Sequence, residues 1–147
     1  MIVRYLSHQD KYDARNGKAI QQTEELSELL HRRRNQKPFI GELSSDNGFQ
    51  IVFGISTDLC CVEYRRIDGE LPYLMAVSPH RPVKRGYVEF LAANTPTPIA
   101  ARYIISFEEL KEIALYFLKT GQRSDAVSWQ IFSPGAIKED VERPPDL

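Results

Sequence analysis

Residues 39–65, FIGELSSDNGFQIVFGISTDLCCVEYR, contain the strand and turn signals on which the predicted fold rests. Large apolar residues occupy every second position from Phe49 to Ile55, as in a strand with one buried face. The DNG sequence at 46–48 is a strong turn signal, and a second such signal, Asp-Gly, follows at 68–69. Strands joined by such short turns must pair antiparallel. This stretch therefore predicts an antiparallel meander.

Apolar runs on both sides of the meander predict further strands, and two helices are expected beside them. Thr23 is expected to cap the first helix, in which Leu26, Leu29 and Leu30 lie at helical spacing. The segment 7–22 before it is polar and is expected to be a loop or hairpin turn. The predicted strands cover residues 2–6, 39–43, 49–55, 59–65, 71–77, 86–91 and 127–132.

The second helix carries the clearest local signals. Ser106 and Glu109 fit a capping box at its start, and an apolar stripe at helical spacing follows. Gly121 suits a left-handed residue at its end. Strands and helices without strict alternation predict an α+β domain over residues 1–132. Its mainly antiparallel sheet should have about five to seven strands, with the two principal helices packed on one face. Residues 133–147 are rich in proline and acids and are expected to form a flexible C-terminal tail.

Composition sets the class of protein. The net charge is −1, which argues against a chain held on nucleic acid by a large positive field. No apolar run approaches the roughly 20 residues that span a membrane, and the start turns polar too soon for a secretory signal. The cysteines, Cys60 and Cys61, are adjacent in a predicted strand and should point to opposite faces as reduced thiols. A cytoplasmic location is therefore expected.

The sequence contains no motif that carries known chemistry. His8, His31 and His80 lack metal-ligand spacing, and phosphate loops and nucleophile elbows are absent. We therefore predict no catalytic residue, no metal and no cofactor. Because folding can bring distant residues together, a small enzyme that uses Glu63, Glu89 or a histidine stays an alternative.

Charge is uneven along the chain. Residues 41–70 contain six acids and two bases, whereas residues 1–40 contain eight bases and five acids. The acidic meander is either a solvated surface or a docking face for a basic partner, and charge alone favours the first. The basic run at 32–34 with Lys37 fits the end of the first helix better than a phosphate site. Trp129 is expected to anchor the core.

The run FLKTGQRSDAVSW at 117–129 resembles the closing signature of immunity protein family 1. These small antidotes of bacterial polymorphic-toxin systems are associated especially with deaminase-fold toxins. The resemblance extends over roughly residues 41–132, and its signature residues here, Gly121 and Trp129, look structural. The chain departs from the family at Ser124, where proline is common after a basic residue.

The resemblance implies that the protein binds a cognate toxin and covers its active site or nucleic-acid channel, with no chemistry of its own. The toxin is expected to be nucleic-acid-modifying and of the deaminase type, so its basic groove should face the acidic meander. No direct nucleic-acid or membrane partner is expected. The other alternative is a homodimeric adaptor module, which a near-zero net charge makes easy. The acids expected to contact the toxin are Asp46, Asp58, Asp68 and Glu70.

Overall fold

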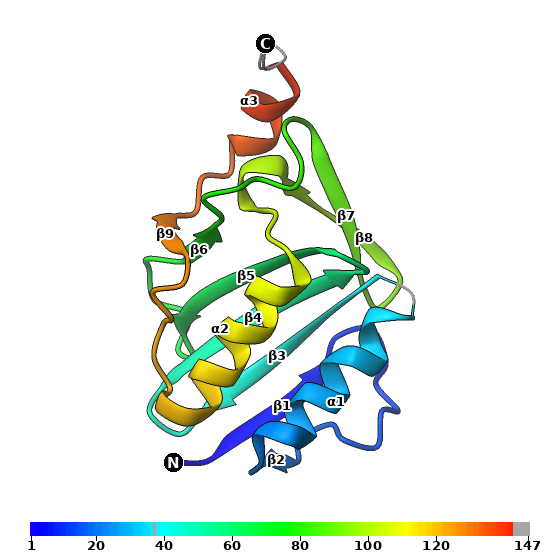
Figure 1. Ribbon diagram of the computed structural model, residues 1–147, viewed down its shortest axis with the longest axis vertical. Coiled ribbons are helices and arrows are strands. Elements are labelled where there is room, and N and C mark those ends of the chain that lie inside the picture. Colours follow the sequence, from blue (N-terminus) through cyan, green and yellow to red (C-terminus); the bar gives the residue numbers. More distant parts are fainter. Residues whose placement is uncertain (37, 143–147) are drawn as a thin grey trace.

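A computed structural model describes residues 1–36 and 38–142 of the chain (Figure 1). Nine strands, two longer helices, a short 3-10 helix and a short C-terminal helix make up these residues. In chain order they are β1 (Val3–Ser7), β2 (Ala19–Ile20), α1 (Thr23–Arg34), β3 (Phe39–Ser45), β4 (Phe49–Ser56), β5 (Leu59–Arg66), β6 (Leu74–Val77), β7 (Tyr87–Ala92), β8 (Thr95–Ala100), η1 (Ala101–Tyr103), α2 (Phe107–Thr120), β9 (Ser128–Ile131) and α3 (Ala136–Glu142).

The main sheet has seven strands in the order β2-β1-β3-β4-β5-β6-β9, and every neighbouring pair is antiparallel. Its centre is the predicted meander, since β3, β4 and β5 pair in succession. Both longer helices lie across the same face of this sheet (Figure 1). The predicted α+β fold, with a mainly antiparallel sheet and two principal helices on one face, is confirmed.

The face that carries α1 and α2 holds the larger core. The alternating residues of β4 point toward the helices, where Phe53 packs with Leu30 of α1 and Phe117 of α2 in one buried cluster. Full burial of each such side chain stabilises the fold by roughly 1.5–3 kcal/mol. The helices therefore depend on the same strand alternation that defines the meander.

A second, smaller core lies on the opposite face. Here the β7–β8 hairpin, η1 and α3 pack over one end of the sheet around Phe90, Cys61 and Met75. The Phe90 ring packs closely against Gly54. A Cβ atom built on Gly54 would lie only 2.6 Å from this ring. Strand β8 was not predicted, since its two prolines (Pro96 and Pro98) are typical of a loop.

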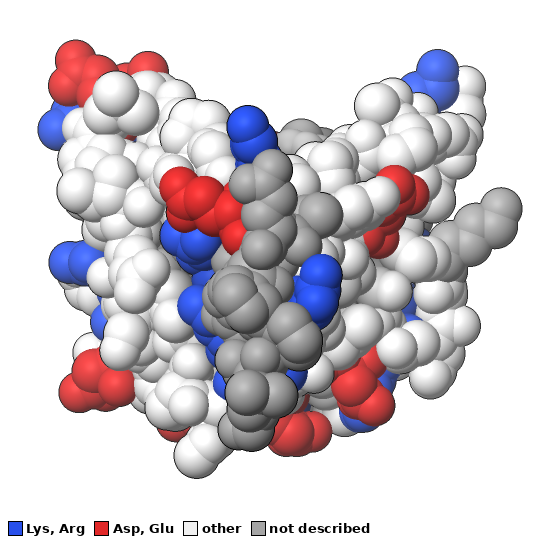
Figure 2. Space-filling model, turned by 90° about the horizontal axis from the view of Figure 1, so that it is seen from above, with Lys and Arg blue, Asp and Glu red and all other residues white. Residues whose placement is uncertain are grey.

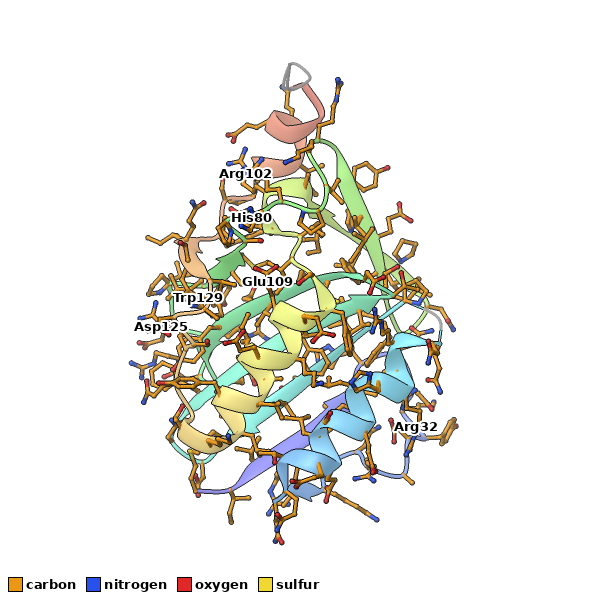
Figure 3. The ribbon with its side chains drawn as sticks, in the orientation of Figure 1. Arg32, His80, Arg102, Glu109, Asp125 and Trp129 are labelled. Atoms are coloured by element: carbon orange, nitrogen blue, oxygen red, sulfur yellow. The ribbon has the colours of Figure 1, made fainter. Side chains whose placement is uncertain are left out.

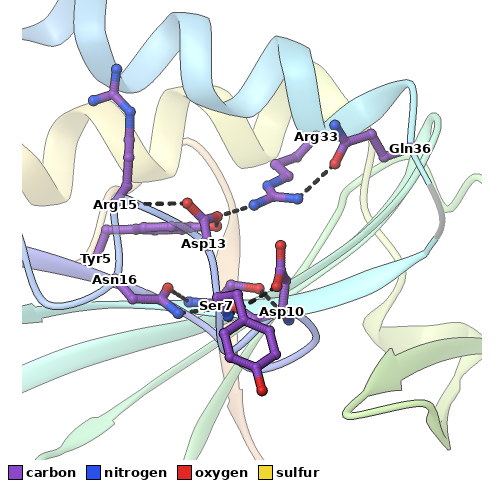
Figure 4. Close-up of polar contacts among 9 residues, drawn as sticks. Tyr5, Ser7, Asp10, Asp13, Arg15, Asn16, Arg33 and Gln36 are labelled. Carbon is purple, nitrogen blue, oxygen red and sulfur yellow. Dashed lines mark hydrogen bonds and ion pairs between the residues drawn. The ribbon is translucent and has the colours of Figure 1, made fainter.

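The segment between β1 and α1 is held by polar contacts (Figure 4). Arg33 of α1 forms an ion pair with Asp13, and the Asn16 side-chain oxygen accepts a hydrogen bond of 2.7 Å from the Ser7 backbone. The predicted loop also contributes the short strand β2. The prediction that Thr23 caps α1 is wrong: Gln22 is the N-cap residue, and Thr23 begins the helix.

The predicted tail begins with ordered structure. Residues 136–142 form α3, and Ala136 is buried in the smaller core. Arg102 and Glu139 form an ion pair with 2.7 Å between Nη2 and Oε2, which joins η1 to α3. Residues 143–147 of the predicted tail lie outside the described residues.

Candidate functional site

The structure brings Asp46 and Asp68 together at one end of the sheet. Asp46 lies in the β3–β4 turn and Asp68 in the β5–β6 connection, and both line a hollow of about 640 Å³. Consecutive turns of an antiparallel meander alternate between its two ends, so these two connections share an end. Glu70 follows in the same connection, where its backbone N–H donates to Asp68 Oδ1 at 3.0 Å.

Asp58 lies at the other end of the meander, in the β4–β5 turn. There it forms an ion pair with Arg34, at the end of α1. The structure thus gathers three of the four predicted contact residues and separates the fourth from them.

Electrostatics at the first end are set by one close pair. Arg66 donates two hydrogen bonds to Asp68 Oδ2, at 3.1 Å from Nε and 2.7 Å from Nη2. The pKa of the Asp68 carboxyl is lowered, first by these bonds and then by the Glu70 backbone N–H. Asp68 therefore stays ionised at neutral pH. We call Asp46, Asp68 and Glu70 the acidic rim, and Arg66 lies beside them.

Gly121 ties the end of α2 to the turn that carries Asp46. Its φ of 68° is left-handed, and its N–H donates to the Phe117 carbonyl at 2.7 Å. Its own carbonyl accepts bonds from Asn47 Nδ2 at 3.1 Å and from the Tyr64 hydroxyl at 3.3 Å. A Cβ atom here would lie 2.3 Å from Asn47 Nδ2. The left-handed backbone favours glycine at this position, and an added Cβ atom would displace the Asn47 side chain that bonds to the Gly121 carbonyl.

Trp129 fastens the closing strand to the same region. Its Nε1–H donates to the Ser124 carbonyl at 2.8 Å. Its ring packs edge-on against the Tyr64 ring, with 6.2 Å between the ring centres. The ring is partly buried against the larger core rather than enclosed by it. In Figure 3, Trp129 lies beside Asp125 at the edge of the sheet. These contacts hold the loop between α2 and β9 in place.

A polar network on the sheet face opposite the helices was not predicted. Glu42 Oε1 lies 2.9 Å from His8 Nε2, and its other oxygen accepts a bond of 3.0 Å from the Ser44 hydroxyl. On β5, Glu63 Oε1 lies 3.3 Å from Arg65 Nη1. These residues alternate with the apolar positions of their strands, and that period-two spacing is the signal that could have placed them on one face.

This network borders a cavity of about 310 Å³ between the sheet and the β7–β8 hairpin. The hydrogen bond from His8 is the main cause that lowers the pKa of Glu42, whereas burial raises the pKa of Glu63. Glu63 lines the cavity together with His8, whereas Glu89 is exposed on β7 and does not line it. The two acids considered for an enzyme are therefore not brought together there.

The thiols are unsuited to nucleophilic chemistry. Cys60 is buried in the larger core and Cys61 in the smaller one, so the prediction of opposite faces is confirmed. Burial raises the pKa of Cys60 to about 12 and raises that of Cys61 as well. Because the thiolate is the reactive species, both groups are inert at neutral pH. Among residues 1–36 and 38–142, no group of three or more His, Cys, Asp or Glu side chains is placed to hold a metal ion.

The basic run at the end of α1 is largely engaged within the protein. Arg33 pairs with Asp13, and Arg34 pairs with Asp58 while its guanidinium lies 4.4 Å from the centre of the Phe107 ring. Arg32 is exposed and lies on the far side of the molecule from Trp129 (Figure 3). Lys37 is outside the described residues. The pairs favour a helix end bonded to its neighbours over a phosphate site.

Charges of both signs are mixed elsewhere as well. Seen from the end that carries α3, basic and acidic side chains are interspersed (Figure 2). Within the described part of the chain, no helix has the length and apolar character needed to cross a membrane.

Comparison with known proteins assigns the chain to a family. The family described as Immunity protein Imm1 matches residues 14–131, which is most of the chain. The comparison with curated proteins gives no match.

Proposed function

This chain belongs to the Imm1 family and is an immunity protein against a toxin, and we propose that it neutralises this toxin by steric occlusion. In this mechanism the protein binds a toxin domain of the deaminase type and covers its active site or nucleic-acid channel. The family match over residues 14–131 is the observation that carries the proposal. The buried, unreactive thiols support a role in which binding alone is sufficient.

We place the toxin contact at the acidic rim. A toxin that acts on nucleic acid needs a positively charged channel to hold the phosphate backbone. Complementary charge accelerates association with such a channel and disfavours wrong partners. Asp46 and Glu70 are exposed at the rim, and Asp68 stays ionised beside Arg66. Asp58 is proposed as a separate contact, since it lies at the opposite end of the meander.

The test is a charge reversal that leaves the Arg66–Asp68 pair intact. The double variant Asp46→Lys/Glu70→Lys should bind the purified cognate toxin domain about tenfold more weakly, mainly through slower association at low salt. The matched control Glu28→Lys/Glu112→Lys makes the same change in charge at exposed helical positions. Calorimetry and stopped-flow measurements would compare the two.

Equal affinity of the rim variant and the wild type would overturn the rim assignment. Equal losses in the two double variants would overturn it too, because they would reflect net charge alone. Asp58→Lys is measured separately. Failure of the wild-type chain to bind the toxin or to rescue cells that express it would overturn the proposed function itself.

A further inference from the structure

Strand β9 ends the main sheet, and among residues 1–36 and 38–142 no strand pairs with its outer edge. It pairs with β6 on one side, with Ile131 opposite Leu74 and Gln130 opposite Met75. The Phe132 N–H donates to the Tyr73 carbonyl at 2.8 Å, so residue 132 directs its backbone groups toward β6. Because hydrogen-bonded and non-hydrogen-bonded positions alternate in an antiparallel pair, residue 130 does the same. Trp129 and Ile131 therefore direct their N–H and C=O groups outward.

Within the described residues, the four-residue strand β9 lacks charged side chains and proline, two of the features that normally protect an edge strand. Native edges are blunted by charged side chains, by proline, by bulges or by short length. Residues 126–137 read AVSWQIFSPGAI and contain no charged residue, and the proline falls beyond β9. Ile131 is 69% exposed. At the other edge of the sheet, β2 has two residues and is too short to act as a template.

We propose that two copies of this chain associate through β9, antiparallel and edge to edge, to form one continuous sheet. A two-fold axis at Gln130 places Trp129 of each copy opposite Ile131 of the other. Those are the residues whose backbone groups face outward, so both cross-strand pairs are hydrogen-bonded in this register. This register also places the aromatic side chain of Trp129 beside the β-branched side chain of Ile131 on the same face of the sheet, which is a favourable cross-strand pair.

Charge favours a second copy over a strongly charged partner at this edge. In the proposed register, residues 126–134 of one copy face residues 126–134 of the other, and neither stretch contains a charged side chain. Like-charge repulsion, the usual barrier to pairing identical edges, is therefore absent from the contact. The net charge of −1 per chain adds little long-range repulsion. A basic partner would instead be drawn to the acidic rim.

The register is tested by a disulfide across the two-fold axis. Gln130 faces its own copy at a non-hydrogen-bonded site, where Cα atoms lie about 4.5 Å apart, within the range that a disulfide spans. Under mild oxidation, Gln130→Cys should give a covalent dimer. Ser128→Cys is the matched control, because residue 128 faces residue 132 and its own copy is about 13 Å away along the strand. The native thiols do not compete, since both are buried.

Light scattering and ultracentrifugation of the full chain measure the association itself. The wild type should have a mass about twice 16.9 kDa at high micromolar concentration. Ile131→Asp should be monomeric with an unchanged circular dichroism spectrum, and Tyr12→Asp, which replaces another exposed apolar residue, should stay dimeric.

A monomeric wild type overturns the proposal, as does a dimer that survives Ile131→Asp. Efficient cross-linking of Ser128→Cys rather than Gln130→Cys overturns the register. If the wild type is monomeric and the amides of Trp129 and Ile131 become protected from hydrogen exchange on adding toxin, the edge binds the toxin instead and the proposal also fails. All arms except the last are run without toxin, so their result is independent of the proposed function.

Discussion

At the scale of the residue, Gly121 acts through its backbone. It gives α2 a left-handed end, and its carbonyl accepts hydrogen bonds from Asn47 in the β3–β4 turn and from Tyr64 of β5. The signature residue therefore connects the last long helix to the turn that carries Asp46. Its place in the sequence predicts the helix end, but the bond to Asn47, 74 residues away, depends on the tertiary fold.

We predict that Gly121→Ala lowers the free energy of unfolding by about 2–4 kcal/mol, since it adds backbone strain and a clash with Asn47. Gly17→Ala is the control: its φ is 77°, but no atom lies within 4 Å of the added Cβ atom. It should lose about 1 kcal/mol from strain alone. Urea unfolding measures both variants, and equal losses would show that contact with Asn47 is unimportant.

Glu42 and Glu63 lie on the sheet face opposite the helices, and their carboxyl groups should make opposite contributions to the pH dependence of stability. The folded-state pKa of Glu42 lies below its ordinary value of 4.5, so its contribution is present above pH 4.5 and is lost as the pH falls through the lowered pKa. The folded-state pKa of Glu63 lies above 4.5. Its contribution is complete below pH 4.5 and is lost as the pH rises through the raised pKa.

We therefore predict that Glu42→Gln is less stable than the wild type at pH 7 and that this difference shrinks below pH 4.5. Stability of Glu63→Gln relative to the wild type should instead be highest at pH 7 and should decrease as the pH approaches 4.5. Urea unfolding of both variants between pH 3 and pH 7 provides the measurement. Parallel pH profiles for the two variants would contradict the opposite pKa shifts.

At the scale of the element, α2 is the part best specified by its own sequence. The predicted capping box is present: the Ser106 hydroxyl accepts a bond of 3.1 Å from the Glu109 N–H, and the Glu109 carboxylate accepts one of 3.0 Å from the Ser106 N–H. Helix α1 begins without such a bond, since the Gln22 side chain makes no cap contact.

This difference predicts unequal responses to alanine at the two N-caps. Ser106→Ala should lower the free energy of unfolding by about 1 kcal/mol, because it leaves the Glu109 N–H without its partner. Gln22→Ala should have little effect, since no cap bond is lost. Thermal and urea unfolding followed by circular dichroism compare them. If Gln22→Ala lowered the free energy of unfolding as much as Ser106→Ala does, the lost Ser106 hydroxyl bond would not explain the destabilisation.

Strands were predicted well where they alternate and less well where they do not. The periodic run of β4 identified a central strand almost to its ends. Strand β6 is shorter than predicted and begins at Leu74, and β8 escaped prediction because a hairpin over a sheet face tolerates its prolines. The alternation of apolar residues along a strand indicates that one face of the strand is buried. It does not indicate which distant hairpin covers the other face.

At the scale of the whole molecule, the family could be identified from the closing signature, but the geometry of the candidate site could not be obtained from charge counts. Counting acids along the meander treats Asp46, Asp58 and Asp68 alike. The topology separates them, since successive turns fall at opposite ends of the sheet. The bond between His8 and Glu42 also spans 34 residues and follows from the pairing of β1 with β3.

The two neighbouring thiols have a consequence for following the protein in solution. Cys60 and Cys61 are adjacent in the chain, yet each is enclosed by a different core, one beneath the helices and one beneath the β7–β8 hairpin. A slow alkylating reagent, with each modified site identified by mass spectrometry, would therefore time the opening of each layer separately. The chain thus contains two native reporters, one residue apart, that distinguish loosening of its hairpin from loosening of its helices.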